Sequence, residues 1–268
     1  YAAHYGEGFA ESAGYGWEGP APALNWDTLK RNRATEIARL NGVYAQMLSN
    51  AGVTRIDGWA QFVDEHTLQV ATLNADGTPG HRRITGQRIL VAVGGTPHVP
   101  HFKGREHVIT SNEMFDLPAF PQRLLIVGGG YIACEFASIF NGLGAQVTQL
   151  YRGEQVLRGF DDEVRHFAAA EMIKHGVDLR LQAGVVSIDK RDDGLHVTLE
   201  DGSALVVDAA LYATGRVPLT QGLGLDAVGV QTDAQGAVVV NSDYQTNVPH
   251  SHAIGDVTNR IQLTPVAL

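Results

Sequence analysis

The stretch Arg123-Leu-Leu-Ile-Val-Gly128-Gly129-Gly130-Tyr131-Ile-Ala-Cys-Glu-Phe-Ala137 decides how this chain folds. Its first part, Leu124 to Val127, is a short apolar run without polar alternation, which predicts a strand buried on both faces. Three glycines follow this run. The apolar residues after them recur at helical spacing, at Ile132, Phe136, Ile139, Phe140 and Leu143. The glycines are therefore predicted to form the turn between a strand and a helix.

This glycine pattern is typical of a dinucleotide-binding turn. Gly128 permits the tight turn, and Gly130 lets the backbone approach a pyrophosphate that rests on the helix N-terminus. Ala133 stands where the pattern accepts Gly or Ala for close packing of helix on sheet. The run from Gly222 to Ala227 matches the same pattern, but no strand precedes it, so we interpret it as a loop.

The next predicted strand, Gln146 to Tyr151, indicates which dinucleotide is bound. A carboxylate about 20 residues after the first glycine would hold the ribose hydroxyls and favour NAD. Here the strand ends in Arg152, and Arg158 follows. Guanidinium groups bind phosphate oxygens in a bidentate manner, so we interpret both arginines as a site for the 2′-phosphate of NADPH. The alternative is that Arg152 is a solvated surface arginine.

Composition excludes several classes of function. The chain has 268 residues, of which 44% are hydrophobic and 18% charged, as in a globular protein with a sizeable core. The net charge of −9 argues against nucleic-acid or anionic-membrane binding as the main role. No apolar run reaches the ~18 residues that span a bilayer, and no signal peptide is visible. The single cysteine cannot form an intramolecular disulfide, and we expect a cytoplasmic protein.

The order of predicted elements indicates an α/β fold with two domains, the first interrupted by the second. The tail of a helix is expected at residues 1–11, and a helix capped by Asn25 from Trp26 to about Asn50, with Leu29, Ile37, Leu40, Tyr44 and Leu48 near one face. Short strands are expected between residues 53 and 93, including a buried strand from Ile89 to Val93. We assign residues 1–94 to the first domain, 95–121 to a proline-rich connector, 122–216 to the second domain and 217–268 to a return to the first.

Motifs along the whole chain resemble the glutathione reductases, which are FAD-containing pyridine nucleotide–disulfide oxidoreductases. The bacterial enzymes are the most similar. The motifs that carry the resemblance are Tyr15-Gly-Trp17, Arg39-Leu-Asn-Gly-Val-Tyr44, Val91-Ala-Val-Gly-Gly95, Ile109-Thr-Ser-Asn112, Gly128 to Glu135, Tyr151-Arg-Gly-Glu-Gln-Val-Leu-Arg-Gly-Phe-Asp161, Ala213-Thr-Gly-Arg-Val-Pro218, Ala253-Ile-Gly-Asp256 and Leu263-Thr-Pro-Val-Ala267. The resemblance implies a Rossmann-like NADPH-binding domain (122–216) inserted into an incomplete FAD-binding Rossmann-like domain with a β-meander.

The resemblance also implies roles for residues on the nucleotide side. Tyr131 is similar to the family's lid tyrosine, which covers the nicotinamide side of the flavin until NADPH displaces it. Glu135 is similar to a buried glutamate near the nicotinamide amide that pairs with a lysine, and a glutamate on the inner face of a helix does need a partner. NADPH would further contact Gly128, Gly130, Ile132, Arg152, Arg158, Gly215 and Arg216.

On the flavin side, the resemblance implies that Asp256 accepts a hydrogen bond from the ribityl chain of FAD. Tyr44 is similar to a tyrosine that touches bound glutathione disulfide, although an aromatic residue at the edge of the core is an equally good interpretation. The remaining FAD-side positions are Ala60, Gly94, Ser111, Gln262, Leu263 and Thr264.

Three positions depart from the family pattern. Val93 stands where relatives often have threonine, which weakens one FAD-side contact. Gly153 stands where a second cation often follows the first arginine, so the preference for NADPH rests on Arg152 and Arg158. Cys134 replaces an aliphatic residue, and we interpret it as a packed hydrophobe without redox activity.

Both ends of the chain look cut. The resemblance implies that a first FAD fingerprint and a CxxxxC redox pair precede Tyr1. It also implies that an interface domain with the catalytic histidine, which acts across a homodimer, follows Leu268. The parent enzyme would reduce glutathione disulfide with NADPH, and we expect the chain alone to be inactive.

Two other functions stay open. One is a related NADPH-dependent reductase with another disulfide substrate, such as trypanothione reductase; NAD-linked relatives such as dihydrolipoamide dehydrogenase are disfavoured by Arg152. The other is a non-catalytic NADP(H)-binding module. We expect no metal site, because the histidines at 98 and 101 and at 250 and 252 lack further ligands nearby in the sequence.

Overall fold

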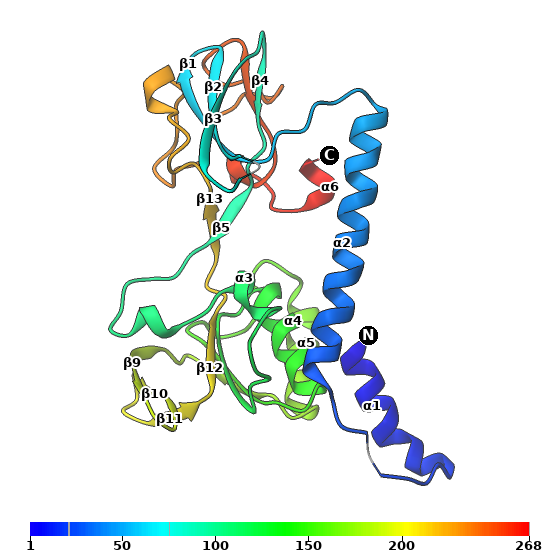
Figure 1. Cartoon of the computed structure of the whole chain (residues 1–268). Coiled ribbons are helices and arrows are strands. Elements are labelled where there is room, and N and C mark those ends of the chain that lie inside the picture. Colours follow the sequence, from blue (N-terminus) through cyan, green and yellow to red (C-terminus); the bar gives the residue numbers. More distant parts are fainter. Residues whose placement is uncertain (21, 75, 268) are drawn as a thin grey trace. The chain divides into compact units, whose positions relative to one another are not determined.

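The computed structural model describes residues 1–20, 22–74 and 76–267. The chain forms two compact units (Figure 1). Unit 1 comprises Tyr1–Glu36 and Pro97–Gly215, and unit 2 comprises Ile37–Thr96 and Arg216–Leu268. This division differs from the expected boundaries in that residues 1–36 and most of the 95–121 segment belong to unit 1. The segment contributes the buried side chains of Met114 and Leu117 to the core of that unit.

A parallel four-stranded sheet forms the centre of unit 1. Its order is β12-β6-β7-β8, with the bounds Ala209–Tyr212, Arg123–Val127, Gln146–Tyr151 and Asp178–Leu181. Helix α4 (Tyr131–Gly142) connects β6 to β7, and α5 (Asp162–Lys174) connects β7 to β8. The expected strand–turn–helix–strand unit and the Rossmann-like α/β fold are confirmed.

Strand β6 is buried on both faces, as its uninterrupted apolar sequence predicts. Leu124 and Ile126 pack in a cluster with side chains of α4 and α5. Leu125 faces the other way, into a second cluster with residues of an antiparallel sheet. That sheet has the order β11-β10-β9, with the bounds Ala204–Val207, Gly194–Leu199 and Val185–Arg191. Strands β9 and β10 are antiparallel neighbours joined by a tight turn, with Arg191 opposite Gly194.

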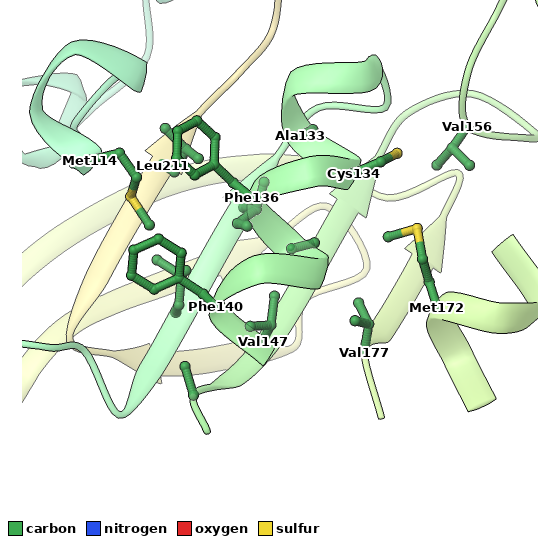
Figure 2. Packing of buried hydrophobic residues seen from close by; sticks show 14 of the residues in the cluster. Met114, Ala133, Cys134, Phe136, Phe140, Val147, Val156, Met172, Val177 and Leu211 are labelled. Atoms are coloured by element: carbon green, nitrogen blue, oxygen red, sulfur yellow. The ribbon is translucent and has the colours of Figure 1, made fainter. Parts of the chain in front are cut away.

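Figure 2 shows the cluster on the helix side of the sheet, where α4 presents Phe136 and Phe140 to the strands. The two rings lie 6.3 Å apart between centroids in a tilted arrangement. Full burial of one such side chain contributes roughly 1.5–3 kcal/mol. Cys134 lies in the same cluster at 8% exposure, so its interpretation as a packed hydrophobe is confirmed.

Helix α1 (Ala2–Ser12) packs against α4 at glycines that allow close approach. A Cβ on Gly142 would lie 2.9 Å from the Cβ of Ala3, and a Cβ on Gly6 would lie 2.9 Å from the carbonyl oxygen of Gly142. The helix expected at residues 1–11 is thus present. The short elements of unit 1 are η1 (Ala13–Tyr15), η2 (Arg105–His107) and α3 (Ser111–Met114).

Helix α2 (Trp26–Asn50) begins where the sequence predicts. The side chain of Asn25 accepts a hydrogen bond from the backbone N–H of Thr28 at 2.8 Å, which confirms the cap. The apolar face of α2 is less buried than that of a helix that faces the core. Ile37, Tyr44 and Leu48 are all exposed among the described residues, Tyr44 at 62%.

Unit 2 contains the expected β-meander, an antiparallel sheet of β1 (Trp59–Asp64), β2 (Thr67–Leu73) and β3 (Pro79–Thr85). Strand β4 (Ile89–Val91) pairs in parallel with β14 (Ser251–Ala253). The prediction of a buried strand at 89–93 is wrong in two respects. Strand β4 ends at Val91, and Leu90 within it is 56% exposed. The other elements are β5 (Gly95–Pro97), β13 (Arg216–Pro218), η3 (Asp226–Val228), η4 (Gly255–Thr258) and α6 (Thr264–Ala267).

Candidate dinucleotide-binding site

The glycine turn and Arg152 lie at the same edge of the parallel sheet. The turn follows β6 and Arg152 follows β7, and these strands are parallel neighbours with Val127 opposite Leu150. The backbone N–H of Gly128 donates to the carbonyl of Leu150 at 2.9 Å, which fastens the turn to the neighbouring strand. Ligands of open α/β sheets bind at this carboxyl edge of the strands.

A different physical reason accounts for the glycine at each of the three positions of the turn. Gly128 has φ +142°, and a Cβ there would lie 2.3 Å from the carbonyl oxygen of Ala213. A Cβ on Gly129 would lie 2.4 Å from Cγ of Tyr151. Gly130 has an ordinary φ of −81°, and a Cβ there would meet no described atom within 4 Å. Packing within the protein therefore requires glycine at positions 128 and 129, whereas Gly130 leaves open space in front of α4.

That open space lies at the N-terminus of α4. Gly130 is the N-cap residue, and within the described residues no side chain caps the first turn of the helix. The first N–H groups of a helix lack partners within it, and they carry the positive end of the helix dipole. A diphosphate fits this arrangement, because it would accept hydrogen bonds from those amides in the space that Gly130 leaves open. Tyr131 is exposed and Ile132 half-buried at this helix end.

Both arginines of the expected phosphate site are exposed. Arg152 and Arg158 belong to the loop 152–161, which leads from β7 to α5. The N–H of Leu157 in this loop donates to the carbonyl of Gly129 at 2.6 Å, so the loop touches the glycine turn directly. Steric packing also explains the glycine at position 153, because a Cβ there would lie 2.6 Å from Cε1 of Tyr151.

Sequence reasoning missed Gln149, which lies beneath the turn. Its side chain is fully buried, and Nε2 donates to the carbonyl oxygen of Gly128 at 3.0 Å. The same nitrogen lies 3.6 Å from Sγ of Cys134, and Oε1 has no hydrogen-bond partner among the described residues. Burial raises the pKa of the Cys134 thiol, so this sulfur stays protonated. The available signal was an amide within the otherwise apolar end of a buried strand.

Glu135 differs from the sequence expectation. A buried glutamate on the inner face of the helix was expected, but Glu135 is exposed. The core-facing positions of α4 are Ala133, Cys134, Phe136, Ala137 and Phe140, and position 135 lies outside this stripe. An exposed carboxylate keeps its hydration and needs no buried partner.

Arg216 lies in unit 2, whereas Gly215 ends unit 1. The guanidinium of Arg216 donates to the carbonyl of Gly95, and its Nε lies 3.9 Å from Oδ2 of Asp256. A Cβ on Gly95 would lie 3.5 Å from Cβ of Asp256. The structure thus brings Arg216 together with the expected FAD-side aspartate.

The other expected FAD-side positions fall in both units. Ala60, Gly94 and Gln262 are half-buried in unit 2, and Leu263 and Thr264 are exposed there. Ser111 is the first residue of α3 in unit 1. Tyr44 lies exposed on α2.

No group of three or more His, Cys, Asp or Glu side chains is arranged to hold a metal ion within residues 1–20, 22–74 and 76–267. In the same ranges, no helix combines the length and apolar character needed to cross a bilayer.

The Rossmann-like fold and the glycine turn are typical of dinucleotide-binding proteins, and comparison with known proteins identifies the family. The model of the family "Pyridine nucleotide-disulphide oxidoreductase" matches residues 4–268, so the chain belongs to this family.

Among curated relatives, glutathione reductase of Burkholderia cepacia is 46% identical over 268 residues, which are all of this chain and 58% of that protein. Glutathione reductase of Nostoc sp. is 40% identical, with 100% and 59% covered. Trypanothione reductase of Trypanosoma congolense is 38% identical, with 99% and 56% covered. The chain therefore spans somewhat more than half the length of these relatives.

A solved structure shows the same fold. The HOCl-induced flavoprotein disulfide reductase RclA from Escherichia coli superposes with a TM-score of 0.86 at 28% identity. The match covers 100% of this chain and 57% of that one.

Proposed function

We propose that this chain forms the NADPH-binding part and some of the FAD-binding part of an enzyme that reduces glutathione disulfide with NADPH. The observation that carries the proposal is the open space at Gly130, at the same sheet edge as the exposed arginines 152 and 158. The glutathione reductases among the relatives support the substrate.

In this proposal, the amides at the start of α4 hold the pyrophosphate of NADPH, and Arg152 and Arg158 hold its 2′-phosphate. Gly128, Gly130, Ile132 and Gly215 give the backbone its close approach to the nucleotide. Tyr131, exposed at the start of α4, is the proposed lid.

FAD, when bound, would supply a carrier for two electrons from the nicotinamide to a redox disulfide, and a thiolate of the resulting reduced cysteine pair would attack the substrate disulfide. Asp256 would accept a hydrogen bond from the flavin's sugar chain, and Arg216, whose Nε lies 3.9 Å from Oδ2 of Asp256, would help to hold that carboxylate in place. The further FAD-side residues in the proposal are Ala60, Gly94, Ser111, Gln262, Leu263 and Thr264. Tyr44 would touch glutathione disulfide, in a cytoplasmic homodimer.

Titration calorimetry of the chain with NADPH and with NADH tests the nucleotide assignment. We expect tighter binding of NADPH, and we expect Arg152→Gln to remove most of that preference. Equal affinities for the two nucleotides in the unchanged chain would contradict the assignment. FAD binding, read from a flavin absorption spectrum after reconstitution, would separate the proposal from a non-catalytic NADP(H)-binding module.

Residues 1–268 are expected to show no turnover of glutathione disulfide, because their single cysteine is buried and cannot form an intramolecular redox disulfide. Turnover by this chain would contradict the proposal. The second candidate substrate is trypanothione disulfide, which the 38% identity to a trypanothione reductase favours. Comparing the two disulfides with the enzyme that contains this chain decides between them.

A further inference from the structure

Arg165 lies on the first turns of α5, and its side chain is only 20% exposed. Its guanidinium makes three contacts. Nε donates to the carbonyl of Val156 at 2.9 Å, and Nη2 donates to the carbonyl of Gln155 at 3.0 Å. Nη1 donates to the carboxylate of Asp162 at 2.7 Å. One side chain thus binds two successive carbonyls of the loop that carries the proposed phosphate ligands.

The loop 152–161 has no helix or strand of its own to fix its shape. Leu157 has φ +57°, a conformation that a leucine rarely adopts, and Gly159 has φ +96°. Such a conformation persists only where surrounding contacts impose it. The contacts of Arg165 are made with the residues immediately before Leu157, so they bear directly on this conformation.

The loop is held from its other side by the glycine turn, through the 2.6 Å bond from the N–H of Leu157 to the carbonyl of Gly129. Asp161 fixes the end of the loop, because its carboxylate caps α5 at the N–H of Glu163. Arg165 therefore completes a set of contacts that connects the proposed pyrophosphate site, the loop and α5.

Arg165 itself is not available as a phosphate ligand. Its donors face main-chain carbonyls, and the carboxylate of Asp162 offsets its charge. Arg152 and Arg158, by contrast, are exposed. Resting on the proposed function, we infer that Arg165 is a positioning residue for nucleotide specificity: it holds the loop in the shape that presents Arg152 and Arg158 to the 2′-phosphate of NADPH.

The test is calorimetric titration of the unchanged chain and of Arg165→Met with NADPH and NADH. We expect Arg165→Met to weaken NADPH binding about tenfold, because small misplacements of binding groups cost about that much or more. NADH binding should change less than about twofold, because NADH lacks the 2′-phosphate. Arg165→Lys, which retains the charge but offers one donor point in place of a fork, should show an intermediate loss.

The matched control is Asp162→Asn, which removes only the ion pair and leaves both carbonyl contacts. It should keep the NADPH preference within about twofold. Circular dichroism establishes whether each variant is folded. If Arg165→Met is unfolded, the comparison is made with Arg165→Lys instead. Equal weakening of NADPH and NADH, or an unchanged preference, would overturn the positioning role. Absence of a preference in the unchanged chain would instead overturn the proposed function, and the role of Arg165 with it.

Discussion

The fully buried amide of Gln149 donates to the carbonyl of Gly128 at 3.0 Å, directly beneath the turn between β6 and α4. The bond gives a buried carbonyl a partner at the point where the chain leaves the strand. It has a cost, because the other polar atom of the same amide, Oε1, has no partner among the described residues. The turn is therefore held by a side chain that is itself only half satisfied.

This balance predicts different effects for two substitutions of Gln149. Gln149→Ala removes the donor and leaves a cavity, and should destabilise the chain by about 2–4 kcal/mol. Gln149→Leu keeps most of the volume and also removes the unpaired Oε1, so its loss should be smaller, about 1 kcal/mol. Urea unfolding of both variants checks the order. A leucine variant that is no more stable than the alanine variant would show that the Gly128 contact matters more than volume.

Substituting the first and third glycines should separate folding from binding. Gly128→Ala places a Cβ 2.3 Å from a main-chain oxygen at a positive φ, and should cost well over ~1 kcal/mol of stability. Gly130→Ala meets no described atom within 4 Å and should cost less than ~1 kcal/mol.

Gly130→Ala should nevertheless weaken NADPH binding about tenfold, because its methyl group enters the space proposed for the pyrophosphate. Thermal unfolding and calorimetry on the two variants measure both effects. Normal NADPH affinity in a folded Gly130→Ala variant would exclude the proposed position of the pyrophosphate.

Local sequence patterns predicted the elements whose cause is local. A few neighbouring residues are enough to predict the strand that includes Leu124, the glycine turn and the helix that follows. The structure contains all three. Strand β3 has little local signal of its own, because its exposed Arg82 and Arg83 break the apolar alternation. Its place in the sheet comes from pairing with β2 rather than from its own sequence.

Side-chain environments were harder to predict than elements. The exposure of Glu135 depends on which stripe of α4 faces the core, and one position separates it from buried Cys134 and Phe136. The role of Arg165 depends on a loop that bends back onto its helix. Neither relationship has a periodic signature, because both arise between segments that tertiary packing brings together.

The ion pair between Arg123 and Asp208 should make stability depend on pH. Burial alone would raise the pKa of Asp208, but hydrogen bonds and the charge of Arg123 outweigh it and lower the pKa of that carboxyl below its ordinary 3.8. A group with a lowered pKa in the folded state contributes stability above its unfolded pKa and loses it as pH falls through the folded value. We expect the melting temperature to fall below about pH 4 by less in Asp208→Asn than in the unchanged chain. Parallel pH profiles for the two proteins would contradict this contribution.

The single cysteine offers a test of core integrity. Burial raises the pKa of the Cys134 thiol and excludes reagents, so both thiolate formation and access are disfavoured. At pH 8 the native chain should react with Ellman's reagent at least about 100-fold more slowly than the urea-unfolded chain. Because Cys134 packs against the turn-supporting amide of Gln149, Gln149→Ala should accelerate the native reaction, whereas the exposed Asp162→Asn substitution on α5 should leave it unchanged. Rapid labelling of the unchanged native chain would mean that the core around α4 opens far more often than its packing implies.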